Sequence, residues 1–246
     1  MTTRDAVDRN LPRRLLALSG TAVVAVVATA FLARFAADVL IHVLGGQEDL
    51  SALTVAGMTL ALPMIVAVAV AARRSGATRA DLHLSAADWR WRWLLPLVGL
   101  VLVLFVIRAA IAVPLLSLER SSSAATPLPP APALVSWGAL AVTVLVVGIF
   151  GPAGEELVFR SVLFRWLLER RHRWVAILLS SALFSVLHVG ALAGSVAGGA
   201  SQLIGTFISG VAYALVYERI RSTWAVMVLH ALNNTLAEVS SALILV

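Results

Sequence analysis

The chain has 246 residues, of which 60% are hydrophobic and 13% are charged, and its mean hydropathy of +0.94 excludes an ordinary soluble protein. Its 19 basic residues are all arginines in short segments between apolar runs. We therefore read the net charge of +6 as a signal of membrane orientation and expect no nucleic-acid partner. The absence of cysteine excludes disulfides, thiolate metal ligands and cysteine nucleophiles.

Hydrophobic stretches divide the chain into about seven predicted membrane spans, because about 20 apolar residues cross roughly 30 Å of hydrocarbon. The predicted spans cover residues 15–33, 50–72, 93–118, 133–168, 174–189, 196–217 and 223–246. The fourth stretch is longer than one crossing, so it projects from the bilayer or bends at Gly151 and Pro152, which gives as many as eight helices. Residues 119–132 are rich in Ser and Pro and predict an irregular loop. The expected fold class is an all-α polytopic transmembrane bundle.

The arginines also indicate which side of the membrane each loop faces. If the N-terminus is cytoplasmic, the arginine-rich residues 73–92, 165–173 and 218–222 lie on that side. Arg34 and Asp38 lie near the far end of the first span, and the opposite loops hold only Arg120. All seven tryptophans fall near predicted span ends, where an indole ring is half in lipid and half in water. We therefore predict that residues 1–14 form a cytoplasmic segment.

Polar residues recur at a spacing of four within three of the predicted spans. The pairs are Glu156 with Arg160, Phe184 with His188, and His230 with Asn234. In a helix each pair shares a face, which leaves Glu155 about 100° away from Glu156 and able to face a cavity. Counted at about 1.5 Å per residue from the nearest arginines, Glu155, His188 and His230 lie roughly 15, 22 and 14 Å into the membrane. These depths predict one polar site formed by the fourth, fifth and seventh spans.

The residue types of this site indicate water activation. A buried carboxylate with a histidine acts as general base and acid, and the His230–Asn234 pair offers two donors to a developing oxyanion. That combination suits hydrolysis of an acyl bond, most naturally a peptide bond. Glu155, His188 and His230 form an alternative Zn²⁺ ligand set with one open position, held between helices because no H-E-x-x-H motif occurs.

In this order, E-E-x-x-x-R, F-x-x-x-H and H-x-x-x-N resemble the motifs of the CAAX-protease and bacteriocin-processing (CPBP, abortive-infection) family of intramembrane proteases. The similarity covers about residues 148–240. The resemblance implies a helical membrane fold with the motif residues facing an internal cavity. It assigns Glu155 and His188 to water activation, His230 and Asn234 to the oxyanion, and Glu156 with Arg160 to support of the site. Both a zinc mechanism and a metal-free glutamate mechanism remain open for such a protein.

The resemblance also divides the chain and predicts its setting. Residues 133–246 form the expected catalytic region, and residues 15–132 contribute three spans without a motif. The expected surroundings are the lipid bilayer, and the expected substrate is a membrane-associated protein or peptide. Arginine without lysine is typical of a GC-rich bacterial genome, so we predict an integral protein of the bacterial cytoplasmic membrane.

Simpler roles compete with these assignments. Glu156 and Arg160 are expected to form a structural ion pair, since opposite charges at this spacing lower the cost of burial. The isolated charges Arg34, Arg108 and Glu238 are expected to pair with Asp38 or with one another, and Asn233 is expected to pack or to make a secondary contact. The alternative function is a non-proteolytic membrane immunity or scaffold protein that uses the same polar cluster to bind a peptide partner.

Overall fold

The computed structural model describes residues 20–43, 50–85, 90–122, 137–193 and 195–244, whose regular structure is entirely helical. The long helices are α2 (Gly20–Val43), α3 (Leu50–Ser75), α4 (Leu94–Ser122), α9 (Val196–Ile220) and α10 (Thr223–Ile244). A segmented central helix consists of α5 (Trp137–Thr143), η4 (Val144–Phe150), α6 (Gly151–Glu156), η5 (Leu157–Phe164) and α7 (Arg165–Leu168). The shorter elements are η3 (Trp91–Trp93), α8 (Arg173–Val186) and η6 (Val189–Ala193). The predicted all-α bundle is confirmed.

Within the described ranges, five helical stretches are long and apolar enough to cross a membrane. They are Gly20–Val43, Thr54–Ser75, Trp91–Glu119, Leu140–Leu168 and Val196–Ile220. The other two predicted spans correspond to α8, which is apolar but only 14 residues long, and to α10, which has 22 residues. Many large apolar side chains remain exposed, as lipid-facing surfaces require. The protein is therefore an integral membrane helical bundle.

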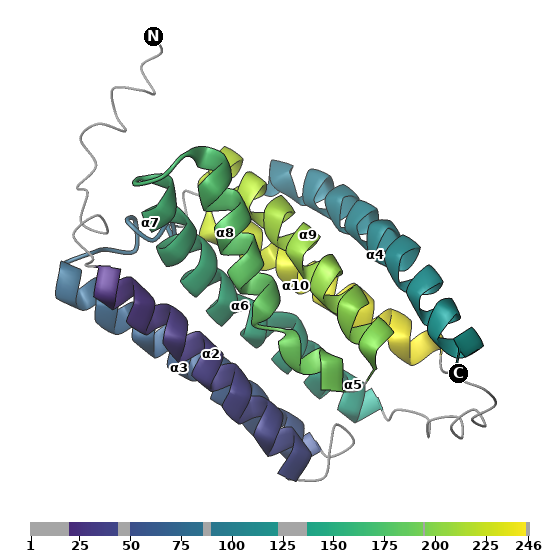
Figure 1. Ribbon diagram of the computed structural model, residues 1–246. Helices are drawn as coiled ribbons and strands as arrows, with labels where there is room; N and C mark the ends of the chain where they lie inside the picture. Colours follow the sequence, from purple (N-terminus) through teal and green to yellow (C-terminus); the bar gives the residue numbers. More distant parts are fainter. Residues whose placement is uncertain (1–19, 44–49, 86–89, 123–136, 194, 245–246) are drawn as a thin grey trace.

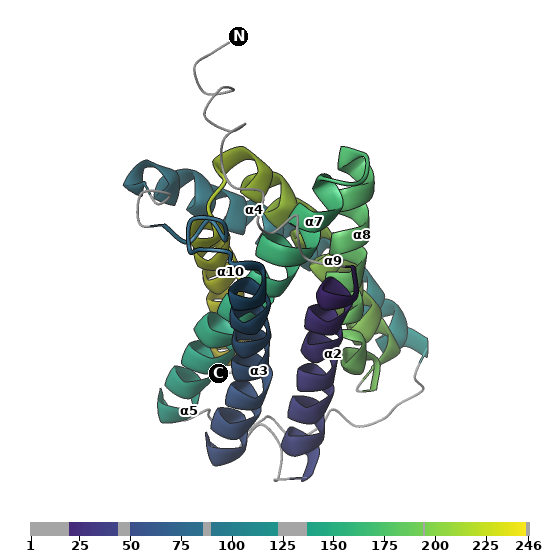
Figure 2. The ribbon, with the colours of Figure 1, turned by 90° about the vertical axis from the view of Figure 1, so that its left-hand side faces the viewer.

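The central helix lies between two groups of helices. Helices α2 and α3 pack side by side and form one wall of the molecule, while α4 packs on α9 at the opposite side (Figures 1 and 2). The central helix contacts α3 through α6 and contacts α10 through η4 and α6. Helix α8 packs between η5 and α9. The two motif-bearing helices α8 and α10 are thereby brought against the segment that carries the two glutamates.

Hydrogen bonds at one end of the bundle fix how these elements meet. The carbonyl of Leu82 accepts from the hydroxyl groups of Ser161 at 3.2 Å and Thr223 at 2.6 Å. The indole of Trp224 donates to the carbonyl of Leu84 at 3.0 Å. Because Ser161 belongs to η5 and Thr223 begins α10, this network sets the position of α10 along the central helix.

The structure corrects two details of the predicted boundaries. Helix α2 continues nine residues beyond Arg34 to Val43, so Arg34 and Asp38 lie within the helix rather than near its far end. Helix α4 continues to Ser122, so the predicted loop at 119–132 begins later. Apolar residues on both sides of Arg34 and Asp38 explain why α2 continues through these charges. The segment 1–14 lies outside the described residues, and the cytoplasmic N-terminus stays a prediction.

Candidate active site

The two glutamates lie in the most buried part of the central helix. Every residue from 154 to 164 is buried, and α6 is flanked by the π-helical turns η4 and η5. Such turns are rare and occur frequently at functional sites. Gly154 lets this segment approach α3 closely, since a Cβ there would lie 3.2 Å from the carbonyl oxygen of Ala61.

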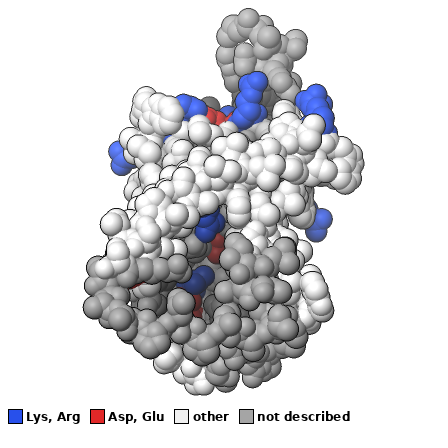
Figure 3. Space-filling model, turned by 90° about the vertical axis from the view of Figure 1, so that its right-hand side faces the viewer, with Lys and Arg blue, Asp and Glu red and all other residues white. Residues whose placement is uncertain are grey.

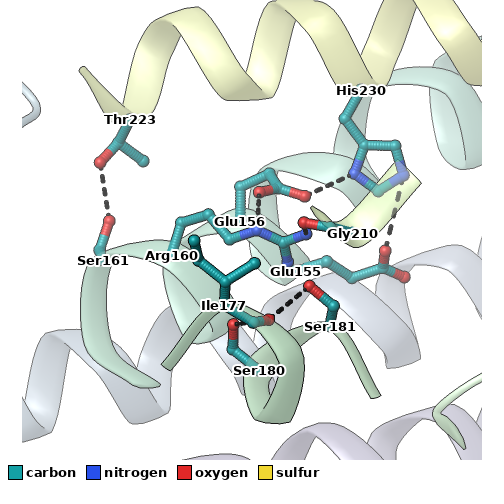
Figure 4. Close-up of polar contacts among 10 residues, drawn as sticks. All are labelled: Glu155, Glu156, Arg160, Ser161, Ile177, Ser180, Ser181, Gly210, Thr223 and His230. Carbon is teal, nitrogen blue, oxygen red and sulfur yellow. Dashed lines mark hydrogen bonds and ion pairs between the residues drawn. The ribbon is translucent and has the colours of Figure 1, made fainter. Parts of the chain in front are cut away.

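Glu156 and Arg160 form the ion pair that their spacing predicts. Arg160 Nε lies 3.3 Å from Glu156 Oε2, and both side chains are fully buried (Figure 4). Arg160 Nη2 donates to the carbonyl of Gly210 on α9 at 3.1 Å. The guanidinium also lies over the rings of Phe184, at 4.6 Å, and Tyr213, at 5.4 Å. The charge of Glu156 is therefore compensated inside the bundle.

His230 lies between the two carboxylates. Its Nδ1 is 2.8 Å from Glu156 Oε1, and its Nε2 is 3.8 Å from Glu155 Oε2 (Figure 4). An ionised carboxylate only accepts, so the short contact places a proton on Nδ1 and orients the ring. The Nε2 edge then faces Glu155 across a gap longer than a hydrogen bond. The sequence predicted Glu156 as the partner of Arg160 alone and did not predict this second contact.

His188 lies in the turn that follows α8 rather than on the helix, which corrects the prediction for the fifth span. Its Nδ1 is 3.0 Å from the carbonyl oxygen of Phe184. A carbonyl only accepts, so Nδ1 carries the proton and the neutral ring has its lone pair on Nε2. Phe184 connects the two histidines, with ring centroids 5.2 Å from His188 and 5.6 Å from His230.

Asn234 is anchored to the central helix. Its Nδ2 donates to the carbonyl of Val147 in η4 at 3.2 Å. An amide group has two N–H bonds, so one donor remains for another acceptor.

A cavity of about 390 Å³ connects the predicted site residues. Its wall includes Glu155, His188, His230 and Asn234, together with Phe184. The structure therefore brings together the three spans that the depth count predicted. Glu156 and Arg160 are outside this wall, behind the ring of His230.

Asn233 and the isolated charges also line the cavity. Arg34 pairs with Asp38 at 3.0 Å, as expected. Arg108 Nη2 donates to Gln202 Oε1 at 2.7 Å, and Glu238 lies near enough to Arg108 for electrostatic attraction. Basic and acidic atoms are visible together in a hollow on one face of the molecule (Figure 3).

Helix α9 carries a row of polar residues on one face, here called the polar stripe, which was not predicted from the sequence. Gln202, Thr206, Ser209 and Tyr213 all line the cavity. Their spacing of four, three and four residues is the helical period and is visible in the sequence. The signal was obscured because small residues of the same helix recur at a spacing of four and predict close helix packing; they are Ala197, Ser201, Gly205 and Ser209.

Glu155, His188 and His230 were predicted as an alternative set of zinc ligands. Among the described residues, no group of three or more His, Asp or Glu side chains is arranged to hold a metal ion. Glu155 and His230 approach each other at 3.8 Å, and Nε2 is the atom of His188 that could bind a metal, because its Nδ1 contacts a backbone carbonyl. As placed, these residues do not fit zinc, and the chemistry proposed below uses the side chains of the chain alone.

The fold and the site together define an integral membrane protein in which buried carboxylates and histidines surround an internal cavity. Residues 137–236 match the family described as type II CAAX prenyl endopeptidase Rce1-like. The match contains all three motifs that carried the resemblance. This region of the chain is therefore similar to the CAAX-protease and bacteriocin-processing family.

The chain is also similar over part of its length to a curated protein. "Putative membrane peptidase YdiL" of Bacillus subtilis (strain 168) is 28% identical over 97 residues, which are 39% of this chain. The alignment spans only 36% of that relative's length. No solved structure matches the chain.

Proposed function

We propose that this protein is an intramembrane endopeptidase that hydrolyses a peptide bond of a membrane-associated protein or peptide. The observation that carries the proposal is the separation of the two adjacent glutamates. Glu156 is paired with Arg160 and His230, whereas Glu155 faces the cavity. Burying a carboxylate that no cation neutralises at hydrogen-bond distance costs free energy. Such a residue is therefore a candidate for a function.

In the proposed reaction, Glu155 accepts a proton from a water molecule, and the resulting hydroxide attacks the carbonyl carbon of the substrate. His188 assists through the lone pair on Nε2. The protonated base then delivers the proton to the leaving amine when the C–N bond breaks, so the enzyme returns to its starting state.

The oxyanion of the tetrahedral intermediate is stabilised by His230, when Nε2 carries a proton, and by the remaining N–H of Asn234. Glu156 and Arg160 act through His230. The carboxylate holds Nδ1, and the guanidinium holds the carboxylate, so the ring is oriented before substrate binds. This is the supporting role that the sequence predicted for the pair.

The setting of the reaction is part of the same proposal. We propose that residues 133–246 form the catalytic region and that residues 15–132 complete the membrane region. The protein is placed in the bacterial cytoplasmic membrane with its N-terminus in the cytoplasm. Because the matched family is described as a CAAX prenyl endopeptidase family, a peptide with a C-terminal CAAX sequence is the first substrate to test.

The test is cleavage by the purified full chain in detergent micelles. The probes are quenched fluorescent peptides that end in a CAAX sequence, with and without a farnesyl group, and a hydrophobic peptide without that ending. We expect the wild type to cleave at least one probe and Glu155→Gln to lower kcat/KM by about 10²-fold or more.

The matched control is Glu218→Gln. Glu218 pairs with Arg173 at 2.8 Å and does not line the cavity, so the same chemical change there should leave cleavage unchanged. Full activity of Glu155→Gln would contradict the proposal. Binding of a probe by the wild type without cleavage would favour the scaffold function instead.

A further inference from the structure

Two buried hydroxyl groups that line the cavity lack a hydrogen bond of ordinary geometry with any described residue. Tyr213 is 0% exposed and Ser209 is 2% exposed, and both line the cavity from the same face of α9. They lie one helical turn apart and are close enough for a weak hydrogen bond with each other, but neither oxygen has a hydrogen bond of ordinary geometry with any described residue. A buried hydroxyl group without a partner is unfavourable.

The other polar residues of the α9 stripe differ in this respect. The side-chain oxygen of Gln202 accepts from Arg108, and the hydroxyl of Thr206 donates to the carbonyl of Gln202 at 2.8 Å. Unsatisfied hydrogen-bonding capacity on the stripe is therefore concentrated at Ser209 and Tyr213.

Packing explains the ring of Tyr213 but not its hydroxyl group. The ring centroid lies 4.9 Å from that of His230 and 6.3 Å from that of Phe184, and the Arg160 guanidinium lies over the ring. Phenylalanine would make the same ring contacts and would avoid burying an oxygen. The hydroxyl group therefore requires a partner that is present at another stage of the protein's activity.

We propose that the hydroxyl groups of Tyr213 and Ser209 form a binding site for the main chain of the substrate peptide. An extended peptide presents carbonyl acceptors and N–H donors along its length, and a hydroxyl group serves either. The site rests on the proposed peptidase function. It places the substrate main chain beside His230, whose ring Tyr213 contacts directly.

The decisive variant is Tyr213→Phe, which removes only the oxygen atom. With the best probe found for the wild type, we expect kcat/KM to fall by about tenfold or more, mainly through a higher KM. Ser209→Ala should change kcat/KM in the same direction. Thermal stability of Tyr213→Phe should equal or exceed that of the wild type, because no hydrogen bond of ordinary geometry within the described residues is lost.

Tyr217→Phe is the matched control. Tyr217 lies one turn further along α9, is 1% exposed and has a hydroxyl group without a hydrogen bond of ordinary geometry, but it does not line the cavity. Its ring instead stacks on His83 and packs against Phe164. We expect this variant to cleave the probe at the wild-type rate.

Each outcome separates this inference from the proposed function. If the wild type cleaves a probe and Tyr213→Phe matches it within twofold, the binding site is wrong while the peptidase function stands. A lower melting temperature for Tyr213→Phe than for Tyr217→Phe would also overturn the site, because the hydroxyl would then be structural. Absence of cleavage by the wild type overturns both.

Discussion

Arg160→Met should destabilise the protein strongly, because it leaves the carboxylate of Glu156 buried without its cation. Arg160 and Glu156 are each 0% exposed, and the guanidinium also bonds to the carbonyl of Gly210. Removing one member of a buried ion pair costs about 3–5 kcal/mol. At about 2–4 °C per kcal/mol for a chain of this size, the melting temperature should fall by roughly 6–20 °C.

The melting temperature is measured by tryptophan fluorescence of the purified protein in detergent micelles. Arg173→Met is the comparison, because its pair with Glu218 lies at the surface and should matter little. The double variant Glu156→Gln, Arg160→Met should recover part of the loss, since the stranded charge is then absent. Arg160→Met with a melting temperature equal to that of Arg173→Met would refute the argument from an uncompensated charge.

Two further predictions concern packing and metal. Gly57→Ala should destabilise the protein by about 1–3 kcal/mol, because the added Cβ would overlap the side chain of Val146. Gly99→Ala is the control, because a Cβ there would have no neighbour within 4 Å and should not destabilise the protein. Equal melting temperatures of the two variants would contradict this packing. Elemental analysis should find no stoichiometric zinc, and a chelator should leave cleavage unchanged, because no described ligand group of three fits a metal. Loss of cleavage on chelation, with recovery on adding Zn²⁺, would show that the side chains rearrange around the ion.

Local spacing and depth in the sequence predicted a large part of the candidate site. The pair Glu156–Arg160 follows from the helical period, and its observed distance of 3.3 Å confirms it. Glu155, His188 and His230 were placed in one layer by counting residues from the arginines, and all three line one cavity. Such inferences succeed because a membrane span must be helical and has a fixed rise per residue.

Contacts between helices were not predictable in the same way. The 2.8 Å contact between His230 and Glu156 depends on how far α10 lies along the central helix, which distant hydrogen bonds to Leu82 help to set. The end of α8 before His188 was missed because Leu187 continues the apolar pattern. No periodic pattern records that a histidine ring bonds to the carbonyl of Phe184.

The two adjacent glutamates are expected to have different roles, Glu156 in the stability of the fold and Glu155 in cleavage. Because consecutive residues point about 100° apart on a helix, Glu156 faces compensating charges while Glu155 faces the cavity. Substitution at Arg160 should therefore appear mainly in the melting temperature. By contrast, Glu155→Gln removes a carboxylate whose burial opposes folding, so it should abolish cleavage at equal or greater stability. A matching loss of stability in Glu155→Gln would mean that Glu155, like Glu156, supports the fold.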